Sequence, residues 1–416
     1  MNFNELFADA KAATATLRRL GPERRNAVIM AVADAVEAAS ADLLSANALD
    51  LQQMSVDNPL YDRLRLTPER IAAIASDMRN VATLPDPLGH VLEDRTLPNG
   101  LRLRKVSVPF GVVGVVFEAR PNVIFDVFSL CFKSGNVSIL KGGKDAANSN
   151  QAALSVIRGA LSSMGVDDRA VTLLPSTHEA TQALLEAVGY VDLLIPRGGR
   201  RLIDFVRDNA RVPVIETGAG VVHAYVDAAA DVAMAAAIVD NAKTRRVSVC
   251  NALDCLIIHR DRLSDLPSIC APLSQSRVEI LADEASYAAL EGRYPAELLQ
   301  HSADADYGTE FMSYRMALKT VPSIVEAIAH IGRYGSGHSE CIVTGDPVAA
   351  ALFQQEVDAA CVYVNAPTSF TDGAQFGLGA EIGISTQKLG ARGPMALREI
   401  TTYKWLIDGN GQLRPR

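Results

Sequence analysis

The stretch GVVGVVFEA, residues 111–119, decides how the fold is interpreted. It is a short, nearly continuous apolar run, which predicts a strand buried on both faces. Similar runs follow at residues 137–143 (VSILKGG), 170–175 (AVTLLP) and 191–199 (VDLLIPRGG), and helical sequence separates them. Strands that alternate with helices predict an α/β fold with a doubly wound, largely parallel sheet.

The sequence before and after these strands predicts an N-terminal helical region, a hairpin and a second α/β unit. Residues 1–85 have the apolar spacing of several helices. The pattern then changes in residues 95–108, where Asn99–Gly100 is a hairpin-turn signal between extended segments that are half solvated or pair with another subunit. A second α/β unit is predicted to begin near Gly218, and the tail from about Gly379 is predicted to be strand plus loop.

Composition limits the possible partners and the compartment. The 416 residues carry a net charge of −8, which disfavours nucleic acid and acidic membranes as main partners. No apolar run approaches the roughly 20 residues that a membrane span requires, and residues 1–20 show no signal peptide. Six cysteines in a chain of this length are too few for a disulfide framework and include no CxxC metal pair, which predicts a reduced, cytoplasmic protein.

The segment NAKTRRVSVCNALDC, residues 241–255, places Cys250 between a helix pattern and a β-branched run. Lys243, Arg245 and Arg246 precede it, and nearby cations favour the nucleophilic thiolate. The alternative is a small buried residue that fills space. The other five cysteines lie in apolar patterns and are predicted to be core: Cys131, Cys255, Cys270, Cys341 and Cys361.

Two glycine pairs follow strands and carry cations, Gly142–Gly143 in LKGGK (140–144) and Gly198–Gly199 in PRGGRR (196–201). Such turns can wrap a pyrophosphate or a ribose, with Lys141 as a hydrogen-bond donor. Neither is the GxGxxG fingerprint, so ordinary strand-to-helix turns with solvated basic residues remain an alternative.

Three more segments carry candidate polar residues. In EARPN (118–122), Arg120 is a candidate anion anchor and Asn122 a candidate oxyanion donor, although Pro121 also suits a simple turn. In IETGAG, Glu216 is either a general base or a cap. His338 lies among small residues in RYGSGHSE, where a core position is unusual.

Together these segments resemble the aldehyde dehydrogenase superfamily and, within it, the γ-glutamyl phosphate reductase family. The similarity covers essentially the whole chain. The segments that carry it are VPFGVVGVVFEARPN (108–122), ILKGGKDA (139–146), IETGAG (215–220), NAKTRRVSVCNA (241–252), VPSIVEAIAHIGRYGSGHSECI (321–342) and GAEIGISTQKLGARGPMALREITTYKW (379–405). The match over 321–342 is the most specific of them.

The resemblance implies an aldehyde dehydrogenase-like fold and NADPH-dependent reduction of L-glutamyl 5-phosphate to L-glutamate 5-semialdehyde and phosphate. This is the second step of proline synthesis from glutamate. The implied catalytic residues are Cys250 as the nucleophile that forms a thioester, with Asn122 and Glu216. The implied cofactor-binding residues are Lys141, Gly142, Gly198, Gly199 and Glu310, and the substrate or phosphate contacts are Arg120, Arg246 and His338. No metal is implied.

The resemblance also implies a domain division and partners. Residues 1–94 and 109–217 are expected to bind NADP, residues 95–108 with about 396–416 to support oligomerisation, and residues 218–395 to form the catalytic domain. The expected assembly is a homodimer or a higher homo-oligomer. The acyl phosphate is the expected substrate, and glutamate 5-kinase is the expected metabolic partner.

Four departures from the family pattern bear on this expectation. Arg245 stands where glutamine is usual, Val247 where proline is usual, Val221–Val222 where a polar pair is common, and Gly390 where histidine is common. Two alternatives therefore stay open: an aldehyde dehydrogenase that hydrolyses its thioester, and an inactive homologue that serves as a scaffold. Basic residues near the expected cofactor site favour NADP over NAD: Lys144, Arg197, Arg200 and Arg201.

Overall fold

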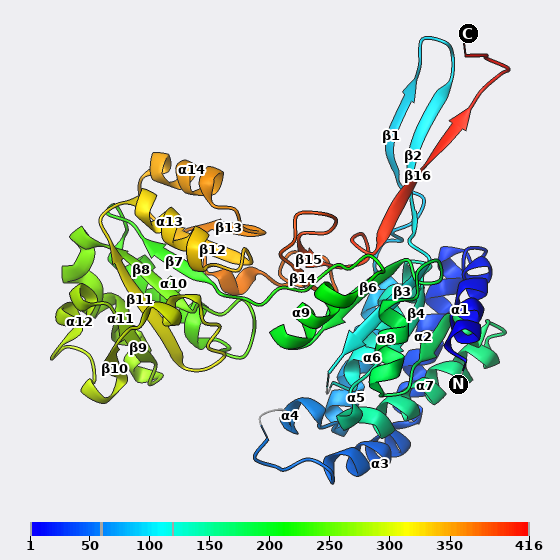
Figure 1. Cartoon of the computed structure of the whole chain (residues 1–416), viewed down its shortest axis with the longest axis horizontal. Helices are drawn as coiled ribbons and strands as arrows, with labels where there is room; N and C mark the ends of the chain where they lie inside the picture. The colour runs from blue at the N-terminus through cyan, green and yellow to red at the C-terminus, as the bar shows by residue number, and fades with distance from the viewer. Residues whose placement is uncertain (1, 59–60, 119, 415–416) are drawn as a thin grey trace. The chain divides into compact units, whose positions relative to one another are not determined.

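The computed structural model describes residues 2–58, 61–118 and 120–414 (Figure 1). No helix in this described part of the chain is both long and apolar enough to cross a membrane.

The chain divides into two compact units. The first unit consists of Met1–Thr217, Gly377–Gly383 and Met395–Arg416. The second unit consists of Gly218–Phe376 and Ile384–Pro394. The assignment of cofactor binding, catalysis and oligomerisation to the sequence-based ranges stays a prediction.

The first unit contains a four-stranded parallel sheet with the order β5-β4-β3-β6. Its strands are β3 (Val112–Phe117), β4 (Val137–Lys141), β5 (Val171–Leu173) and β6 (Leu193–Arg197). All six residues of β3 are buried, as the apolar run predicted. Because the strands are parallel, the turns after β3, β4 and β6 meet at one edge of the sheet.

Helices surround this sheet, and the several helices predicted over residues 1–85 are confirmed. The α-helices are α1 (Phe3–Leu17), α2 (Pro22–Ala38), α3 (Ser40–Leu51), α4 (Tyr61–Leu64), α5 (Pro68–Thr83), α6 (Asn122–Lys133), α7 (Ala147–Ser163), α8 (His178–Leu185) and α9 (Arg200–Asn209). Short 3₁₀ helices are η1 (Lys144–Ala146) and η2 (Asp168–Ala170). In α5 the Thr67 hydroxyl accepts from the backbone N–H of Arg70 at 3.2 Å, which satisfies one of the N–H groups left open at a helix start.

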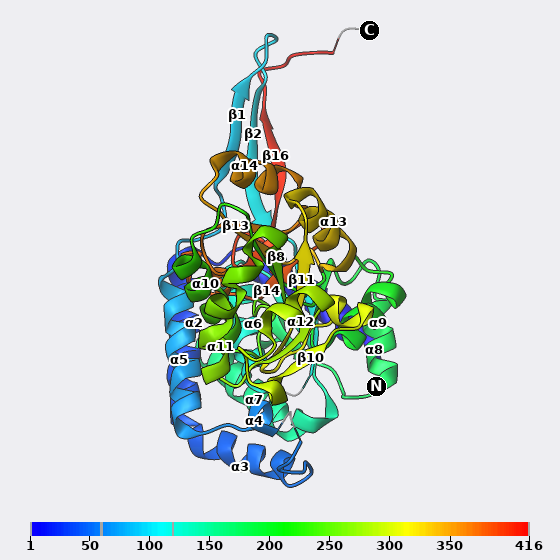
Figure 2. The ribbon, with the colours of Figure 1, turned by 90° about the vertical axis from the view of Figure 1, so that its left-hand side faces the viewer.

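A second, antiparallel sheet of the first unit joins the predicted hairpin to the C-terminal strand. It has the order β1-β2-β16, with β1 (Val91–Thr96), β2 (Arg102–Pro109) and β16 (Thr401–Asp408) side by side (Figures 1 and 2). Gly100 has φ 87°, which favours glycine in the predicted turn. The Lys105 ammonium lies 3.7 Å from the Tyr403 ring. Oligomerisation through this sheet stays a prediction.

The second unit contains a seven-stranded sheet with the order β10-β9-β11-β8-β7-β12-β13, and its neighbouring strands are parallel. The strands are β7 (His223–Val226), β8 (Cys255–His259), β9 (Glu279–Ala282), β10 (Leu299–His301), β11 (Arg315–Val321), β12 (Ser339–Val343) and β13 (Cys361–Val364). The helices are α10 (Val232–Thr244), α11 (Leu266–Gln275), α12 (Glu284–Leu290), α13 (Ile324–Tyr334) and α14 (Pro347–Glu356), with η3 (Arg260–Asp265), η4 (Ala296–Leu298), η5 (Asp304–Gly308) and η6 (Thr368–Phe370). The remaining strands, β14 (Gly383–Ser385) and β15 (Gly393–Met395), pair with each other.

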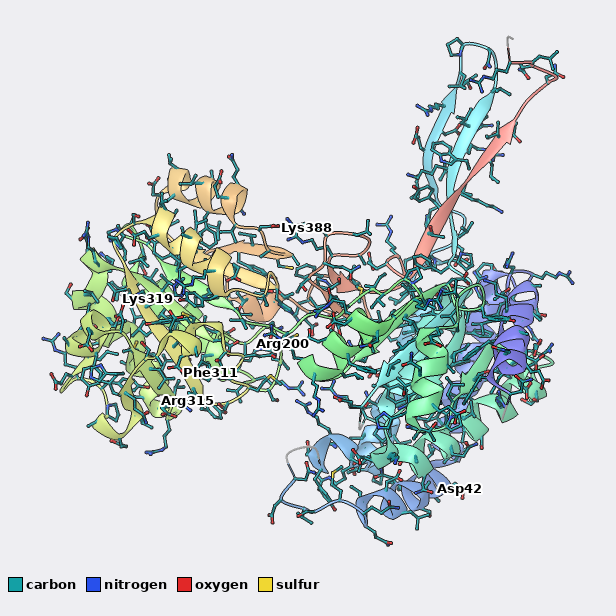
Figure 3. The ribbon with its side chains drawn as sticks, viewed as in Figure 1. Asp42, Arg200, Phe311, Arg315, Lys319 and Lys388 are labelled. Atoms are coloured by element: carbon teal, nitrogen blue, oxygen red, sulfur yellow. The ribbon has the colours of Figure 1, made fainter. Side chains whose placement is uncertain are left out.

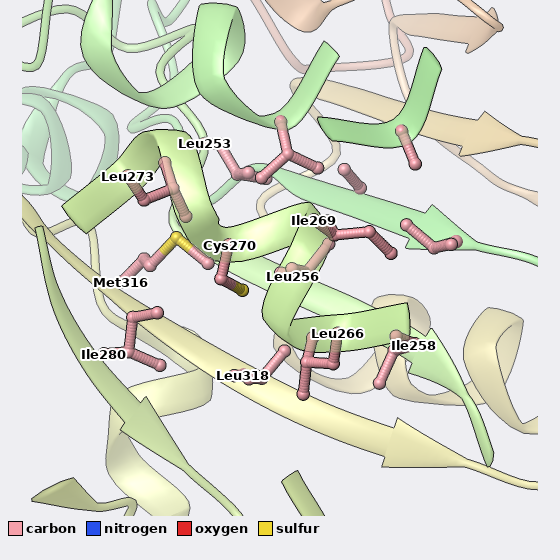
Figure 4. Packing of buried hydrophobic residues seen from close by; sticks show 14 of the residues in the cluster. Leu253, Leu256, Ile258, Leu266, Ile269, Cys270, Leu273, Ile280, Met316 and Leu318 are labelled. Atoms are coloured by element: carbon pink, nitrogen blue, oxygen red, sulfur yellow. The ribbon is translucent and has the colours of Figure 1, made fainter. Parts of the chain in front are cut away.

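Alternating side chains of this sheet pack against different helices on its two faces. On one face, Leu256 and Ile258 of β8 pack in a cluster with α10 and α11, which Figure 4 shows from close by. On the other face, Cys255 and Ile257 of the same strand pack with α13 and α14, where Phe353 is fully buried. The period of two in a strand explains this division, because successive side chains point to opposite faces.

Candidate active site

Cys250 lies in the loop that connects α10 to β8 in the second unit, as its position in the sequence predicted. It is partly exposed, whereas the other five cysteines are buried. Burial raises the pKa of Cys131, Cys270 and Cys341 to about 12, which keeps those thiols protonated. Exposure therefore separates Cys250 from the other thiols, and the predicted core positions of those five are confirmed.

Buried side chains anchor the loop after Cys250. The amide of Asn251 donates to the Thr371 carbonyl at 2.9 Å, and the Thr368 hydroxyl donates to the Asn251 carbonyl at 2.9 Å. The backbone N–H of Asp254 donates to the Val222 carbonyl at 3.0 Å. These contacts fix the chain immediately after the candidate nucleophile.

Lys243 has a different role from the one that the sequence predicted. Its side chain is fully buried, and its ammonium donates to the Leu253 carbonyl at 2.8 Å and lies 3.9 Å from the Asp254 carboxylate. Burial lowers the pKa of Lys243 and raises the pKa of Asp254. Lys243 thus supports the backbone of the loop, while Arg245 and Arg246 are exposed.

The glycine loop before β7 packs directly on the backbone of Cys250. A Cβ on Gly220 would lie 1.6 Å from the Cys250 carbonyl oxygen, so only glycine fits at this position. The backbone N–H of Gly220 donates to the Glu310 carboxylate at 3.0 Å. The structure therefore brings Cys250, Gly220 and Glu310 together in the second unit. The nicotinamide-ribose contact expected of Glu310 stays a prediction.

In the first unit, Lys141 ends β4 and Gly142 follows it at the edge where the parallel strands end. Burial and the nearby Lys144 lower the pKa of Lys141. A Cβ on Gly142 would lie 2.2 Å from the amide nitrogen of Asn150, so the backbone and this side chain are in close contact.

Asn150 is a site candidate that the sequence interpretation missed. Its side chain on α7 is buried, and neither its amide nitrogen nor its amide oxygen has a hydrogen-bond partner among the described residues. Such groups are rare because an unpaired buried amide costs about 1–3 kcal/mol. A signal existed in the sequence, since Asn150 shares the helical spacing of the buried Ala153, Leu154 and Ile157.

The glycine pair at 198–199 lies at the start of α9. The backbone N–H of Gly199 donates to the Glu118 carboxylate at 2.8 Å, so a carboxylate caps the positive end of this helix. Arg200, labelled in Figure 3, is the first residue of the helix and is exposed. The predicted cofactor contact of Gly198 and Gly199 stays a prediction.

The residues proposed around the substrate occupy varied environments. The Asn122 amide donates to the Asp126 carboxylate at 2.9 Å within α6, and burial raises the pKa of Asp126 to about 6. Arg120 is exposed. Glu216 lies in the first unit with its carboxylate 3.5 Å from the Arg207 guanidinium. Their roles in catalysis or binding stay predictions.

The expectation that His338 avoids the core is wrong. Its side chain is fully buried, its Nδ1 lies 2.7 Å from the Ser339 hydroxyl, and burial lowers its pKa to about 4. The ring is therefore neutral at pH 7. The short residues around it allow the loop to fold over the ring, which a local pattern cannot reveal. This burial does not favour a direct phosphate contact.

Comparison with known proteins identifies relatives that match nearly the whole chain. No protein-family model matches it. The γ-glutamyl phosphate reductase of Bacteroides fragilis is 60% identical over 414 residues, which cover 100% of both chains. The reductase of the same name from Chlorobium limicola is 55% identical over 408 residues, which cover 98% of both chains.

Solved structures agree with these relatives. The crystal structure of γ-glutamyl phosphate reductase from Thermotoga maritima matches with a TM-score of 0.95 and 39% identity, and covers 99% of both chains. An engineered glycolyl-CoA reductase with bound NADP⁺ matches with a TM-score of 0.67 at 15% identity, over 97% of this chain and 95% of that one. The second match shows the fold alone, which is that of aldehyde dehydrogenase-like proteins, as the sequence predicted.

Proposed function

The chain belongs to the γ-glutamyl phosphate reductase family, and on that premise we propose that it reduces L-glutamyl 5-phosphate to L-glutamate 5-semialdehyde and phosphate with NADPH. The observation that carries the proposal is Cys250, the partly exposed thiol in a loop held by buried side chains. The reaction is the second step of proline synthesis from glutamate. Glutamate 5-kinase, which would supply the acyl phosphate, is the proposed metabolic partner, and the cytoplasm is the proposed compartment.

Cys250 is the proposed nucleophile. Its thiolate attacks the acyl carbon of the substrate, a carbon–sulfur bond forms, and the bond to the phosphate oxygen breaks with its electron pair leaving on phosphate. The product of this step is a thioester on Cys250. When the aldehyde forms, the sulfur leaves the same carbon as thiolate and is ready for another turnover.

Oxyanion stabilisation is proposed for the Cys250 backbone N–H and the Asn122 amide. A primary amide carries two N–H donors, so the bond from Asn122 to Asp126 leaves a second donor for this purpose. One well-placed donor is worth about 3–4 kcal/mol of transition-state stabilisation. The exposed Arg246 and Arg120 are the proposed contacts of the phosphate group, since a guanidinium matches phosphate oxygens in a bidentate geometry.

The edge of the first unit's sheet fits a nicotinamide dinucleotide. The Asn150 amide, which has no hydrogen-bond partner among the described residues, and the half-buried ammonium of Lys141 offer hydrogen bonds to ribose or phosphate oxygens, and Gly142 lets the backbone approach closely. When bound, the nicotinamide would supply the hydride that reduces the thioester carbon. The fit supports a nicotinamide cofactor, and the preference for NADP over NAD is part of the proposal.

The deciding experiment runs the reaction backwards. Purified protein is mixed with glutamate semialdehyde and NADP, and NADPH formation is followed as inorganic phosphate is titrated in. We expect a rate that saturates with phosphate and disappears in Cys250→Ala, while the core variant Cys270→Ala keeps it.

Other outcomes would identify the alternatives. Oxidation that proceeds at the same rate without phosphate would identify a hydrolytic aldehyde dehydrogenase. If no turnover occurs in either direction and substrate does not slow the alkylation of Cys250, the chain is an inactive homologue that serves as a scaffold.

A further inference from the structure

A second cluster of chemically active side chains lies inside the second unit, and none of its members was assigned to catalysis or cofactor binding. His223 begins β7, Cys255 begins β8, and His330 lies on α13. One nitrogen or sulfur atom of each residue lies within 4.8 Å of the corresponding atoms of the other two. All three residues are buried, with 0% of His223, 0% of Cys255 and 9% of His330 exposed.

The fold brings these three residues together for clear reasons. His223 and Cys255 are direct partners in the register of the parallel strands β7 and β8. Their side chains belong to the sheet face that α13 covers, because Cys255 packs in the same cluster as Ile331 of that helix. The Cys255 sulfur consequently lies 3.8 Å from Nε2 of His330.

Glu340 orients the ring of His223 and selects its tautomer. Its carboxylate accepts from the backbone N–H of His223 at 2.9 Å, and the same oxygen lies 3.1 Å from Nδ1 of the ring. A carboxylate accepts hydrogen bonds, so in the neutral ring Nδ1 is the donor and Nε2 carries the lone pair. That Nε2 is buried and has no hydrogen-bond partner among the described residues. Metal-binding histidines commonly have this carboxylate–imidazole arrangement.

Burial and neighbouring charges shift the pKa values of Cys255 and His330. Burial raises the pKa of Cys255, and the carboxylates of Glu340, Asp254 and Asp283 raise it further, while the Lys319 ammonium, labelled in Figure 3, lowers it. Burial lowers the pKa of His330 to about 3. The cluster therefore contains the neutral imidazole of His330 and a protonated thiol next to the fully buried carboxylate of Glu340, whose second oxygen also lacks a partner among the described residues.

We propose that Nε2 of His223, the sulfur of Cys255 and Nε2 of His330 bind one zinc ion, with Glu340 as the carboxylate that orients His223. Zinc accepts nitrogen and sulfur ligands at about 2.0–2.3 Å, which in a tetrahedron puts a nitrogen and a sulfur about 3.5 Å apart. The separation of 3.8 Å between Cys255 and His330 is already close to this value. A water molecule fills the fourth position.

The binding step involves no redox change. The Cys255 S–H bond breaks, its proton goes to solvent, and one sulfur–zinc and two nitrogen–zinc bonds form. The added positive charge also compensates the buried Glu340 carboxylate. His223 follows the glycine loop whose Gly220 packs on the Cys250 carbonyl, so the ion would stiffen the support of that loop. The absence of a CxxC pair made the sequence predict no metal, because this set spans residues 223 to 330.

Zinc binding can be tested without measuring catalysis. The full-length protein is stripped with a chelator, incubated with zinc sulfate, gel-filtered, and analysed for zinc per chain. We expect one zinc per chain in the wild type and no stoichiometric zinc in Cys255→Ser or His330→Gln. Glu340→Gln should weaken zinc binding by about 10–100-fold, as loss of an orienting carboxylate usually does.

Matched variants distinguish this site from other thiols. Cys270→Ala removes a buried thiol that lies among apolar side chains in Figure 4, and Cys250→Ser removes the exposed thiol. Both should keep one zinc per chain.

Cobalt(II) adds a spectroscopic measurement, since its thiolate charge-transfer band should appear in the wild type and be missing in Cys255→Ser. Circular dichroism of the metal-free variants checks that they are folded. Zinc retained at wild-type affinity in folded Cys255→Ser, or lost in Cys250→Ser alone, would overturn the proposal. Absence of zinc binding to the wild type would overturn it as well.

Discussion

The loop around Cys250 and the sheet edge around Gly142 differ in how their buried polar groups are satisfied. The loop is held from within, by the buried ammonium of Lys243 and by the close packing of Gly220. At the sheet edge, the buried amide of Asn150 has no partner among the described residues. The difference supports the proposal that the protein itself positions the candidate nucleophile, whereas a bound cofactor completes the polar contacts at the sheet edge.

The largest expected effect is a difference in thiol reactivity. At pH 8 a thiol with a pKa of about 12, such as Cys270 or Cys341, is ionised in about one molecule in 10⁴. We expect iodoacetamide to modify Cys250 at least about 10³-fold faster than the buried thiols. Peptide mass spectrometry over a time course measures the ratio. Equal rates in the folded protein would contradict the proposed exposure of the loop.

The next effect concerns the buried ammonium that supports the loop. Lys243→Met leaves the Asp254 carboxylate buried without its cation, which should lower the free energy of unfolding by about 3–5 kcal/mol. Urea unfolding followed by circular dichroism measures the change. Arg245→Met, an exposed change two residues away, serves as the control and should alter stability by less than about 0.5 kcal/mol.

Gly220→Ala tests the packing of the glycine loop on Cys250. The new methyl group would displace the Cys250 carbonyl, so we expect a loss of about 1–3 kcal/mol in stability together with a lower kcat. Gly332→Ala in α13 is the matched control, because a Cβ there meets nothing within 4 Å. If Gly220→Ala has the melting temperature and the kcat of the wild type, the close packing of Gly220 on the Cys250 carbonyl contributes to neither stability nor catalysis.

The smallest effect should appear at the sheet edge, and there it should concern binding. Asn150→Ala removes an amide that makes no hydrogen bond within the described part of the chain, so stability should stay within about 1 kcal/mol of the wild type. The KM for NADPH should rise about 10-fold while the KM for the acyl phosphate is unchanged. Ser155→Ala, exposed on the same helix, should change neither constant. If Asn150→Ala lowers stability and leaves the KM for NADPH unchanged, Asn150 supports the fold, as Lys243 does in the Cys250 loop, and does not bind the cofactor.

Several features of the fold and site could be predicted from local sequence. The buried strand at 112–117, the helix that ends at Thr244 and the strand that begins at Cys255 each follow from apolar periodicity in a short window. The strands and helices between β8 and α13 were not predicted; β9 and β10 have only four and three residues, too few for a clear pattern. Their positions depend on pairing with distant strands.

The sequence by itself determined the family, the α/β class and the position of Cys250 at a helix-to-strand connection, because these depend on residue types that are close together in the chain. Only the tertiary structure decided that Lys243 is buried beneath the loop, that His338 is in the core, and that His223, Cys255 and His330 meet. Burial and cross-strand register result from contacts between residues that are far apart in sequence. A change of environment of this kind alters the charge and the partners of a side chain without changing its local pattern.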